Sequence, residues 1–514
     1  MMKEFFDNQK QSHSETSIWF PICLGIILRG VQAWMPIVGI HSWRQADTAA
    51  MARHFYLSRA PIWLPQIDWG GASAGYVESE FPVFPYLTSQ LYQLFGVHEW
   101  LGRFLSILFS GLTIWLIIRL GRRWFNPAAG WWGGMAMAVA PLGVYYGRGF
   151  QAEALMLLCA AAALECHGFW SRHRSKWGLI LSWLFFTTAA LIKVIPLLWL
   201  GLPLLLVHLT PDPREQAESL RSITQQLLKL LRSPGFWIYS GASIAVVSVW
   251  YFHAYQLGEV SGLSFGFWGE DSDRSNVGLI LNLSSWLNLT LRTGVRLLSV
   301  IGIPFLILGG IRSWSTGGGR IAFGGLIGVL LCTIATMQSS TVHEYYQLPL
   351  LLFTSPLIGL GWVSWQKKAS RKLIRAFLTL WIMISLVVLS FDYWAVERRQ
   401  SGIWMPLAKT IRSELPAEAL IVTVTGPDPT LLNLARRQGW LISSEKITPS
   451  RIAELKQAGA SHLAGSFLWE ETYQSMPEVH RKTLHHIASS SNDAWIHEDS
   501  QTYLVPIKAL PNNF

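Results

Sequence analysis

Long apolar segments separated by short polar stretches recur between residues 18 and 392 of this chain. A helix that crosses the hydrocarbon core of a bilayer needs roughly 20 mostly apolar residues. About eleven segments fit this requirement. They lie near residues 18–38, 100–121, 130–146, 150–169, 177–192, 194–209, 235–252, 291–311, 321–338, 347–363 and 376–392. The sequence therefore predicts a mostly α-helical protein, a polytopic membrane helix bundle of about eleven spans.

The composition agrees with a membrane protein. Only 14% of the residues are charged, whereas soluble proteins usually carry about 25%. The 27 tryptophans suit aromatic belts at two membrane interfaces. The net charge of +10 does not indicate a nucleic-acid partner, because the basic residues form short clusters between apolar segments. The four cysteines all fall in apolar segments and show neither metal-site spacing nor a disulfide pattern.

Positive charges between the apolar segments predict the orientation of the bundle, because cytoplasmic loops carry an excess of lysine and arginine. A cytoplasmic N-terminus places nearly all strong basic clusters inside, at residues 122–123, 172–176, 214–232, 312–320 and 367–375. The short apolar segment Phe81–Phe95 contains two prolines and is interpreted as an interfacial helix. The first apolar segment lacks a cleavage site and is expected to remain as an anchor. We therefore expect a multi-pass protein of the cytoplasmic (inner) membrane.

Three larger segments then face outward, at residues 39–99, 253–290 and 393–514. The sequence thus predicts a membrane domain at 1–392 and a small extracytoplasmic α/β domain at 393–514. The elements expected in the second domain are a strand at Leu420–Thr425, a turn with an N-cap at Gly426–Pro429, a helix at Thr430–Gln438 ended by Gly439, a helix at Ser450–Ala458, and strands within Ala494–Ile507. Prolines in the turn remove backbone donors and exclude a phosphate cradle. A structural or partner-docking role of this domain is left open.

A polar, charged cluster from His41 to Thr48 follows the first apolar segment and contains Asp47. Two interpretations of Asp47 are open and compatible. Asp47 precedes a helical run, where aspartate is a favoured N-cap. An ionised carboxylate just outside a membrane helix can also act as a general base toward an acceptor hydroxyl. Asp47 is therefore the candidate catalytic residue.

A second acid, Glu80, directly precedes the expected interfacial helix and could share a cleft with Asp47 as an acid on the acceptor side. Solvated loop acids are the alternative for Glu80 and for the neighbouring Glu78.

Four basic residues lie near the expected outer face of the bundle. A group of cations beside an outer-leaflet cleft suits a lipid phosphate, and charged side chains at membrane depth are usually functional or paired. These residues are Arg44, Arg53, Arg148 and Lys193. Lys193 could instead extend to the membrane interface.

The segment Thr341–Pro349 lies at the outward end of two spans. Its polar residues His343, Tyr346 and Gln347 could contact a sugar phosphate, and an interfacial aromatic belt is the alternative. The His-Glu pair in this segment is not a zinc-protease motif, because no second histidine follows at the required spacing. Farther upstream, Asp271-Ser272-Asp273 could bind a divalent cation through carboxylate oxygens.

Two motifs resemble a known superfamily. The Trp-x-x-x-Asp pattern of Trp43 and Asp47 in the first outward loop, within His-Ser-Trp-Arg-Gln-x-Asp-Thr-Ala, resembles the GT-C polyprenyl-phosphate-sugar glycosyltransferases. His-Glu-Tyr-Tyr-Gln-Leu-Pro is similar to a bacterial branch of the same group, which includes protein O-mannosyltransferases and aminoarabinose transferases (glycosyltransferase family 39-like). The resemblance covers roughly residues 18 to 392. It implies a GT-C-like bundle that transfers a hexosyl or pentosyl group with inversion from a polyprenyl-phosphate sugar.

The resemblance also implies that Asp47 occupies the position of the first-loop acid that activates the acceptor. One departure concerns the donor. Aminoarabinose transferases carry Lys-Pro-Pro-Leu before the interfacial helix, with the lysine near the donor phosphate, whereas this chain has Glu80-Phe81-Pro82-Val83. Another cation, such as Arg148 or Lys193, would have to replace that lysine, or Glu80 serves on the acceptor side. Aminoarabinose transfer to lipid A is therefore not expected.

The expected partners are a polyprenyl-phosphate sugar donor, membrane lipids and a lipid, glycan or protein acceptor, with no nucleic acid. No organic cofactor and no resident metal site are expected, and a divalent cation is left open. Two other functions compete with glycosyl transfer. A transporter or flippase should show inverted repeats around a midplane site, and none is evident. A non-catalytic envelope assembly protein would use residues 393–514 as its docking module.

Overall fold

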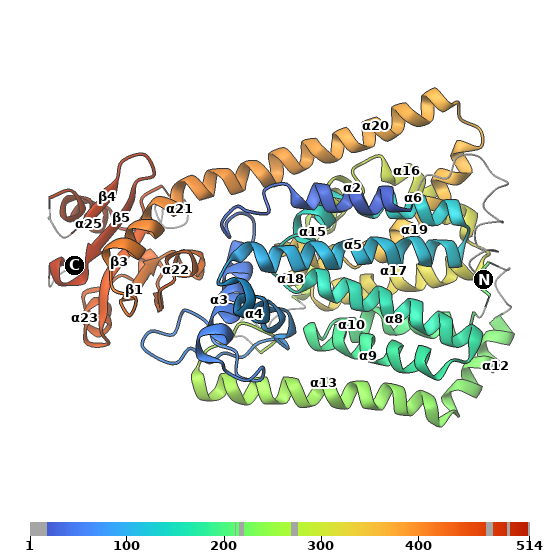
Figure 1. Ribbon diagram of the computed structural model, residues 1–514, viewed down its shortest axis with the longest axis horizontal. Helices are drawn as coiled ribbons and strands as arrows, with labels where there is room; N and C mark the ends of the chain where they lie inside the picture. Colours follow the sequence, from blue (N-terminus) through green and yellow to red (C-terminus); the bar gives the residue numbers. More distant parts are fainter. Residues whose placement is uncertain are drawn as a thin grey trace.

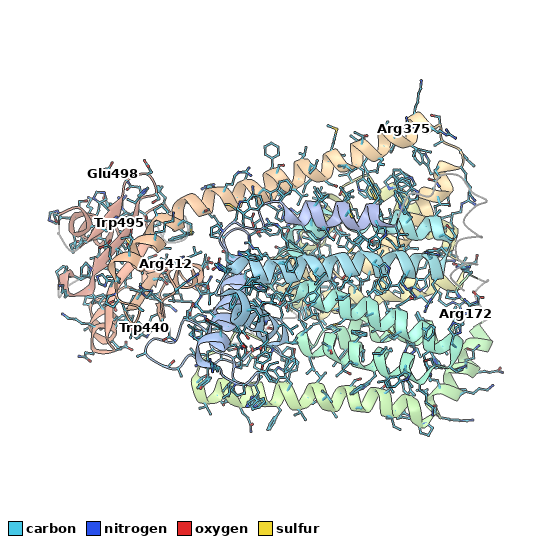
Figure 2. The ribbon with its side chains drawn as sticks, viewed as in Figure 1. Arg172, Arg375, Arg412, Trp440, Trp495 and Glu498 are labelled. Atoms are coloured by element: carbon cyan, nitrogen blue, oxygen red, sulfur yellow. The ribbon has the colours of Figure 1, made fainter. Side chains whose placement is uncertain are left out.

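The computed structural model describes residues 18–210, 212–214, 220–268, 276–468, 476–490 and 494–511. Figure 1 shows a helix bundle and a C-terminal α/β domain placed end to end, with α3 (Ser42–Ser58) and α4 (Val83–Phe95) between them. The basic residues Arg172 and Arg375 lie at the end of the bundle that is opposite to the C-terminal domain (Figure 2).

The bundle is built from apolar helices of unequal length. They are α2 (Trp19–Gly30), α5 (Glu99–Trp124), α6 (Pro127–Val139), α8 (Glu153–His173), α9 (Lys176–Ile192), α11 (Gly201–His208), α13 (Pro234–Ser261), α16 (Gly302–Ser313), α17 (Gly317–Ala335), α19 (Leu350–Gln366) and α20 (Arg371–Val388). At the centre, α19 packs against α6 and α16. A Cβ added at Gly309 would lie 1.9 Å from the Leu357 carbonyl oxygen, and one at Gly361 would lie 1.9 Å from that of Phe305. Glycine therefore permits the close approach of α16 and α19.

Within the described residues, five helices are long and apolar enough to cross a membrane. The expectation of about eleven spans stays a prediction, because several apolar helices are shorter than a bilayer requires. One expected span is wrong as a straight helix. The stretch near 291–311 includes the end of one helical segment, Leu283–Leu297, and most of the next, Gly302–Ser313, and the two segments meet at 99°. Ser299 and Val300 adopt positive φ between them and break the helix.

The C-terminal domain contains a five-stranded sheet in the order β2-β1-β3-β5-β4. Strand β1 (Leu420–Val424) runs parallel to β2 (Gly439–Leu441) and to β3 (Ala460–Ser466). Strand β5 (Thr502–Pro506) is antiparallel to β3 and to β4 (Trp495–His497). The helices of this domain are α22 (Thr430–Ala435), α23 (Pro449–Gln457) and α25 (Glu478–Ser490). The edge strand β2 lies beside the loop that precedes α4, because its residue Gly439 forms a bridge with Trp69.

Two boundaries differ from expectation. The helix expected at Thr430–Gln438 ends at Ala435, because Arg436 adopts a left-handed conformation, and Gly439 starts β2 instead of ending that helix. The expected domain boundary at 392–393 falls inside a helical stretch that runs from Arg371 to Glu414. This stretch comprises α20, a π-helical segment (Leu389–Trp394) and α21 (Ala395–Glu414). One helical connection therefore joins the bundle to the C-terminal domain.

Candidate functional site

Asp47 lies inside α3 and not at its start. The helix begins at Ser42 after His41, whose φ is 55°, so the interpretation of Asp47 as an N-cap is wrong. Tertiary contacts extend the helix toward its N-terminus. The Ser42 hydroxyl accepts a 2.9 Å hydrogen bond from Thr430, and the Gln45 amide oxygen accepts one of 2.9 Å from the Phe150 backbone.

Asp47 is almost completely buried, with 2% of the residue exposed. Its Oδ1 accepts a 3.0 Å hydrogen bond from the Trp69 indole nitrogen. Burial raises the pKa of Asp47 well above its usual value, and the neighbouring carboxylates of Asp68 and Asp428 raise it further, against the lowering effects of Trp69 and Arg44. A carboxylate with a raised pKa is a stronger base toward a hydroxyl proton.

Asp47 lines a cavity of about 1820 Å³, called here the large cavity. The bundle side of the large cavity includes His41, Trp43, Trp69 and His343. Its other wall belongs to the C-terminal domain and includes Asp428, Trp440, Lys446 and Arg451. Trp440 is labelled in Figure 2. The large cavity therefore lies between the two parts of the protein, and both contribute side chains to it.

A second cavity of about 350 Å³, the intermediate cavity, contains the cations. It shares Trp43, Ser264, Phe265, Ser339 and His343 with the large cavity. Its own charged lining residues are Arg44, Glu80 and Lys193. The two cavities thus adjoin, with Asp47 lining one and two basic residues lining the other.

Arg44 forms an ion pair with Glu80 and donates a 2.9 Å hydrogen bond to the Phe265 carbonyl oxygen. The Arg44 guanidinium also lies 4.2 Å from the centre of the Phe265 ring. Glu80 is therefore neither a freely solvated loop acid nor a neighbour of Asp47 in the large cavity. It is the carboxylate that balances and orients Arg44.

Lys193 follows α9 and donates a 2.6 Å hydrogen bond to Glu153 at the start of α8. The two side chains are 8% and 2% exposed, so Lys193 does not extend to a membrane interface. Its ammonium lies 4.5 Å from the ring centre of Tyr345 and 5.0 Å from that of Tyr346. Lys193 thus faces the intermediate cavity with an aromatic wall beside it.

Gln151 and Glu153 are site residues that the sequence reasoning missed. Both line a small cavity of about 30 Å³ together with Arg44 and Lys193. Gln151 is 1% exposed, and neither of its amide atoms has a hydrogen-bond partner among the described residues. Polar residues at the very start of an apolar span were the available signal, because such groups are rarely placed there without a partner.

His343 connects the cavities, since it lines both the large and the intermediate one. Its ring stacks on Tyr345 at 5.3 Å and lies 5.5 Å from Trp43. Burial lowers the pKa of His343 to about 3, and the nearby His41 and cations add to the effect. His343 is therefore a neutral group, and its Nδ1 has no partner within the described parts of the chain.

Three predicted contacts lie outside these cavities. Arg148 donates a 2.6 Å hydrogen bond to Glu397 and is 1% exposed. Gln347 donates to the Leu289 carbonyl oxygen at 3.2 Å. Arg53 pairs with Asp68. The remaining acid of the first loop, Glu78, accepts hydrogen bonds from Ser264, Gly266 and Phe267 and so fixes the backbone of the segment at 264–267.

The described residues contain no group of three or more histidine, cysteine or acidic side chains that could hold a metal ion. Asp271 and Asp273, which were considered for a divalent cation, lie outside the described residues.

Comparisons with known proteins agree with this architecture. The family model described as "Dolichyl-phosphate-mannose-protein mannosyltransferase" matches residues 79–251. ArnT from Cupriavidus metallidurans bound to undecaprenyl phosphate superimposes with a TM-score of 0.63 at 13% identity, over 96% of this chain and 98% of that chain. This protein has a GT-C glycosyltransferase fold. The GT-C fold that the sequence resemblance implies is therefore confirmed, whereas the motifs around Trp43 and His343 lie outside the residues that the family model matches.

Two other solved structures have the same GT-C fold. ArnT in the apo state has a TM-score of 0.62 at 15% identity and covers 95% of this chain and 97% of that chain. Archaeal oligosaccharyltransferase AglB from Archaeoglobus fulgidus, in complex with an inhibitory peptide and a dolichol-phosphate, has a TM-score of 0.55 at 11% identity, over 88% of this chain and 69% of that chain. No curated protein matches the chain in sequence. The long apolar helices among the described residues indicate a multi-pass membrane protein.

Proposed function

We propose that the protein is an inverting glycosyltransferase that moves a hexosyl or pentosyl group from a polyprenyl-phosphate donor to a lipid, glycan or protein acceptor. One observation carries the proposal. A buried carboxyl, Asp47, lines the large cavity, and two cations, Arg44 and Lys193, line the adjoining intermediate cavity. Transfer from a lipid phosphate requires a base for the acceptor and cations for the leaving phosphate. Here the base and the two cations line adjoining cavities that share several residues.

The donor phosphate fits the intermediate cavity. Lys193 has three ammonium donors, of which Glu153 uses one. Arg44 is oriented by Glu80 and Phe265, so its position does not depend on the ligand. Tyr346 and the neutral His343 can donate or accept hydrogen bonds at the same cavity. The cations Arg44 and Lys193 would replace the lysine that precedes the interfacial helix in aminoarabinose transferases.

The reaction then proceeds by direct displacement. The acceptor oxygen attacks the anomeric carbon while the bond from that carbon to the phosphate oxygen breaks. The polyprenyl phosphate leaves with the electron pair, and Arg44 and Lys193 stabilise its charge. The proton of the acceptor hydroxyl passes to Asp47. A single attack from the face opposite to the phosphate inverts the anomeric configuration.

The orientation of the bundle supports transfer on the outer side of the cytoplasmic membrane. Arg172 and Arg375 lie at the end opposite to the C-terminal domain (Figure 2), as the positive-inside rule requires of the cytoplasmic end. The cavities lie at the other end, beside the C-terminal domain. Nucleotide sugars are absent on that side, which favours a lipid-linked donor.

Mass spectrometry of envelope lipids, glycans and glycoproteins from a deletion strain tests the proposal. The strain is complemented with the wild-type protein, with Asp47→Asn, or with Asp499→Asn, an exposed aspartate of the C-terminal domain. We expect one sugar to be missing in the deletion strain and in the Asp47→Asn strain only. Restoration of that sugar by Asp47→Asn would contradict the proposal. Movement of the lipid-linked sugar across liposomes without a new glycosidic bond would favour a transporter.

A further inference from the structure

We propose that Trp69 is a positioning residue for Asp47 and that the C-terminal domain keeps Trp69 in place. The inference rests on the proposed role of Asp47 as the base. In this proposal the C-terminal domain helps to position the base. A domain that served only for docking or for structural support would not need to do so.

The contact between the two side chains is specific. The indole nitrogen can only donate a hydrogen bond, and it donates one of 3.0 Å to Asp47 Oδ1. This bond fixes one carboxyl oxygen and leaves the other for the acceptor proton. It also favours the ionised carboxylate, since it lowers the pKa of Asp47 against the effect of burial. Trp69 therefore orients the carboxyl group and opposes the effect of burial on its charge.

The backbone around Trp69 is joined to the sheet of the C-terminal domain. Trp69 pairs with Gly439 in a parallel bridge. The Gly439 amide donates to the Asp68 carbonyl oxygen at 3.0 Å, and the amides of Gly70 and Gly71 donate to the Gly439 carbonyl oxygen at 3.0 and 2.7 Å. The segment Asp68–Gly71 thus extends the edge of the sheet beside β2, as an added strand does.

The same domain also holds the helix that carries Asp47. Arg53 of α3 pairs with Asp68 and donates a 2.8 Å hydrogen bond to Asn433 of α22. Thr430, the first residue of α22, donates to Ser42 at the start of α3. Asp47 and Trp69 therefore meet where α3 and the segment at 68–71 both contact the C-terminal domain.

Glycine is required where the sheet meets this segment. A Cβ added at Gly439 would lie 1.7 Å from the Ile421 carbonyl oxygen. Gly71 has a φ of +67°, and a Cβ there would lie 2.3 Å from the Trp440 ring. A substitution at either glycine removes no side chain that lines the cavities, so both positions test the connection itself.

The first test measures the dependence of transfer rate on pH with the full-length protein in membrane vesicles, a labelled donor and an envelope extract as acceptor. Trp69→Phe keeps an aromatic ring and removes the donor. The acidic limb of the pH–rate profile of this variant should shift to higher pH by about one to two units, because losing a hydrogen bond to a charged group corresponds to roughly that many pKa units. Trp63→Phe, an exposed tryptophan of the same loop, should leave the profile unchanged. An unshifted profile in Trp69→Phe would overturn the proposal.

The second test measures hydrogen exchange at the amides of Gly70 and Gly71, which needs no activity. These amides should be protected in the wild-type protein, and Gly439→Ala should abolish the protection and shift the pH profile as Trp69→Phe does. The matched control is Gly465→Ala, which inserts a Cβ elsewhere in the same sheet, 2.6 Å from the Tyr503 hydroxyl. A pH shift in Gly465→Ala of equal size would show a general effect of sheet damage. If Asp47→Asn were fully active, the proposed base would be wrong even with protected amides.

Discussion

Lys193 and Glu153 form a nearly buried ion pair, with 2.6 Å between the ammonium nitrogen and the carboxylate oxygen, at the junction of the intermediate and small cavities. Glu153 is the first residue of α8, and Lys193 directly follows α9. These two consecutive helices pack against each other. Removing one partner of such a pair leaves an uncompensated buried charge, whereas removing both does not. Stability and function can therefore be separated at this pair.

Lys193→Met should lower the free energy of unfolding by about 3–5 kcal/mol and abolish transfer. The double variant Lys193→Met/Glu153→Gln should recover most of the stability but none of the activity, because the phosphate still lacks its cation. Thermal unfolding in detergent and transfer assays on the same samples would check this. Recovery of activity together with stability would assign Lys193 a purely structural role.

Asp47→Asn should reduce the rate of transfer by about 100-fold or more, the usual contribution of a general base, without lowering stability at neutral pH. Its folded-state pKa is raised above the unfolded value, so the native state binds more protons and stability falls as pH rises through that window. Asparagine removes this decline and can still accept the Trp69 hydrogen bond. Unfolding free energies measured from pH 4 to 8 should thus be flatter in the variant. A marked loss of stability would instead indicate a structural carboxylate.

The transfer rate should rise with pH through the raised pKa of Asp47, because only the ionised form accepts a proton. His343 has a pKa of about 3 and stays neutral across this range. His343→Gln should therefore lower the rate while leaving the midpoint of the acidic limb in place. A shifted midpoint in that variant would make the histidine a titrating group in the reaction.

Gln151→Leu should weaken donor use without weakening the fold. Both amide atoms of Gln151 lack partners among the described residues, so leucine removes an unsatisfied buried group. We expect the donor KM to rise about tenfold, the equivalent of one lost hydrogen bond, with an equal or higher melting temperature. An unchanged KM would mean that the small cavity does not contact the donor.

Much of the fold follows from local patterns. Apolar length predicts the long helices of the bundle, and the alternation of strand and helix patterns predicts β1 and α23 to within a residue or two. The break at Ser299 and Val300 was missed, because the segment near 291–311 is apolar enough on average to be interpreted as one span, although Gly302 and Pro304 follow the break. The early end of α22 was also missed. Arg436 ends the helix in a left-handed conformation, which arginine rarely adopts.

The site was predictable where its residues lie close together in sequence, and less so elsewhere. Asp47 and Arg44 share one helix. Arg148 was a reasonable candidate for a phosphate contact by charge and position. Its partner Glu397 is 249 residues away, so nothing local reveals that the charge is already balanced. Trp69 was one tryptophan among 27, and only its hydrogen bond to Asp47 and its bridge to Gly439 distinguish it.

The uninterrupted helical stretch from Arg371 to Glu414 spans the distance from the far end of the helix bundle to the C-terminal domain. Forty-four residues at 1.5 Å each make a rod of about 66 Å, roughly twice the thickness of the hydrocarbon core. Such a rod sets the distance between the far end of the helix bundle and the C-terminal domain, and the direction in which that domain faces. One inserted residue would turn the domain by about 100° and carry Gly439 away from Trp69. The length of this one helical rod therefore determines whether the edge of the sheet can meet Trp69.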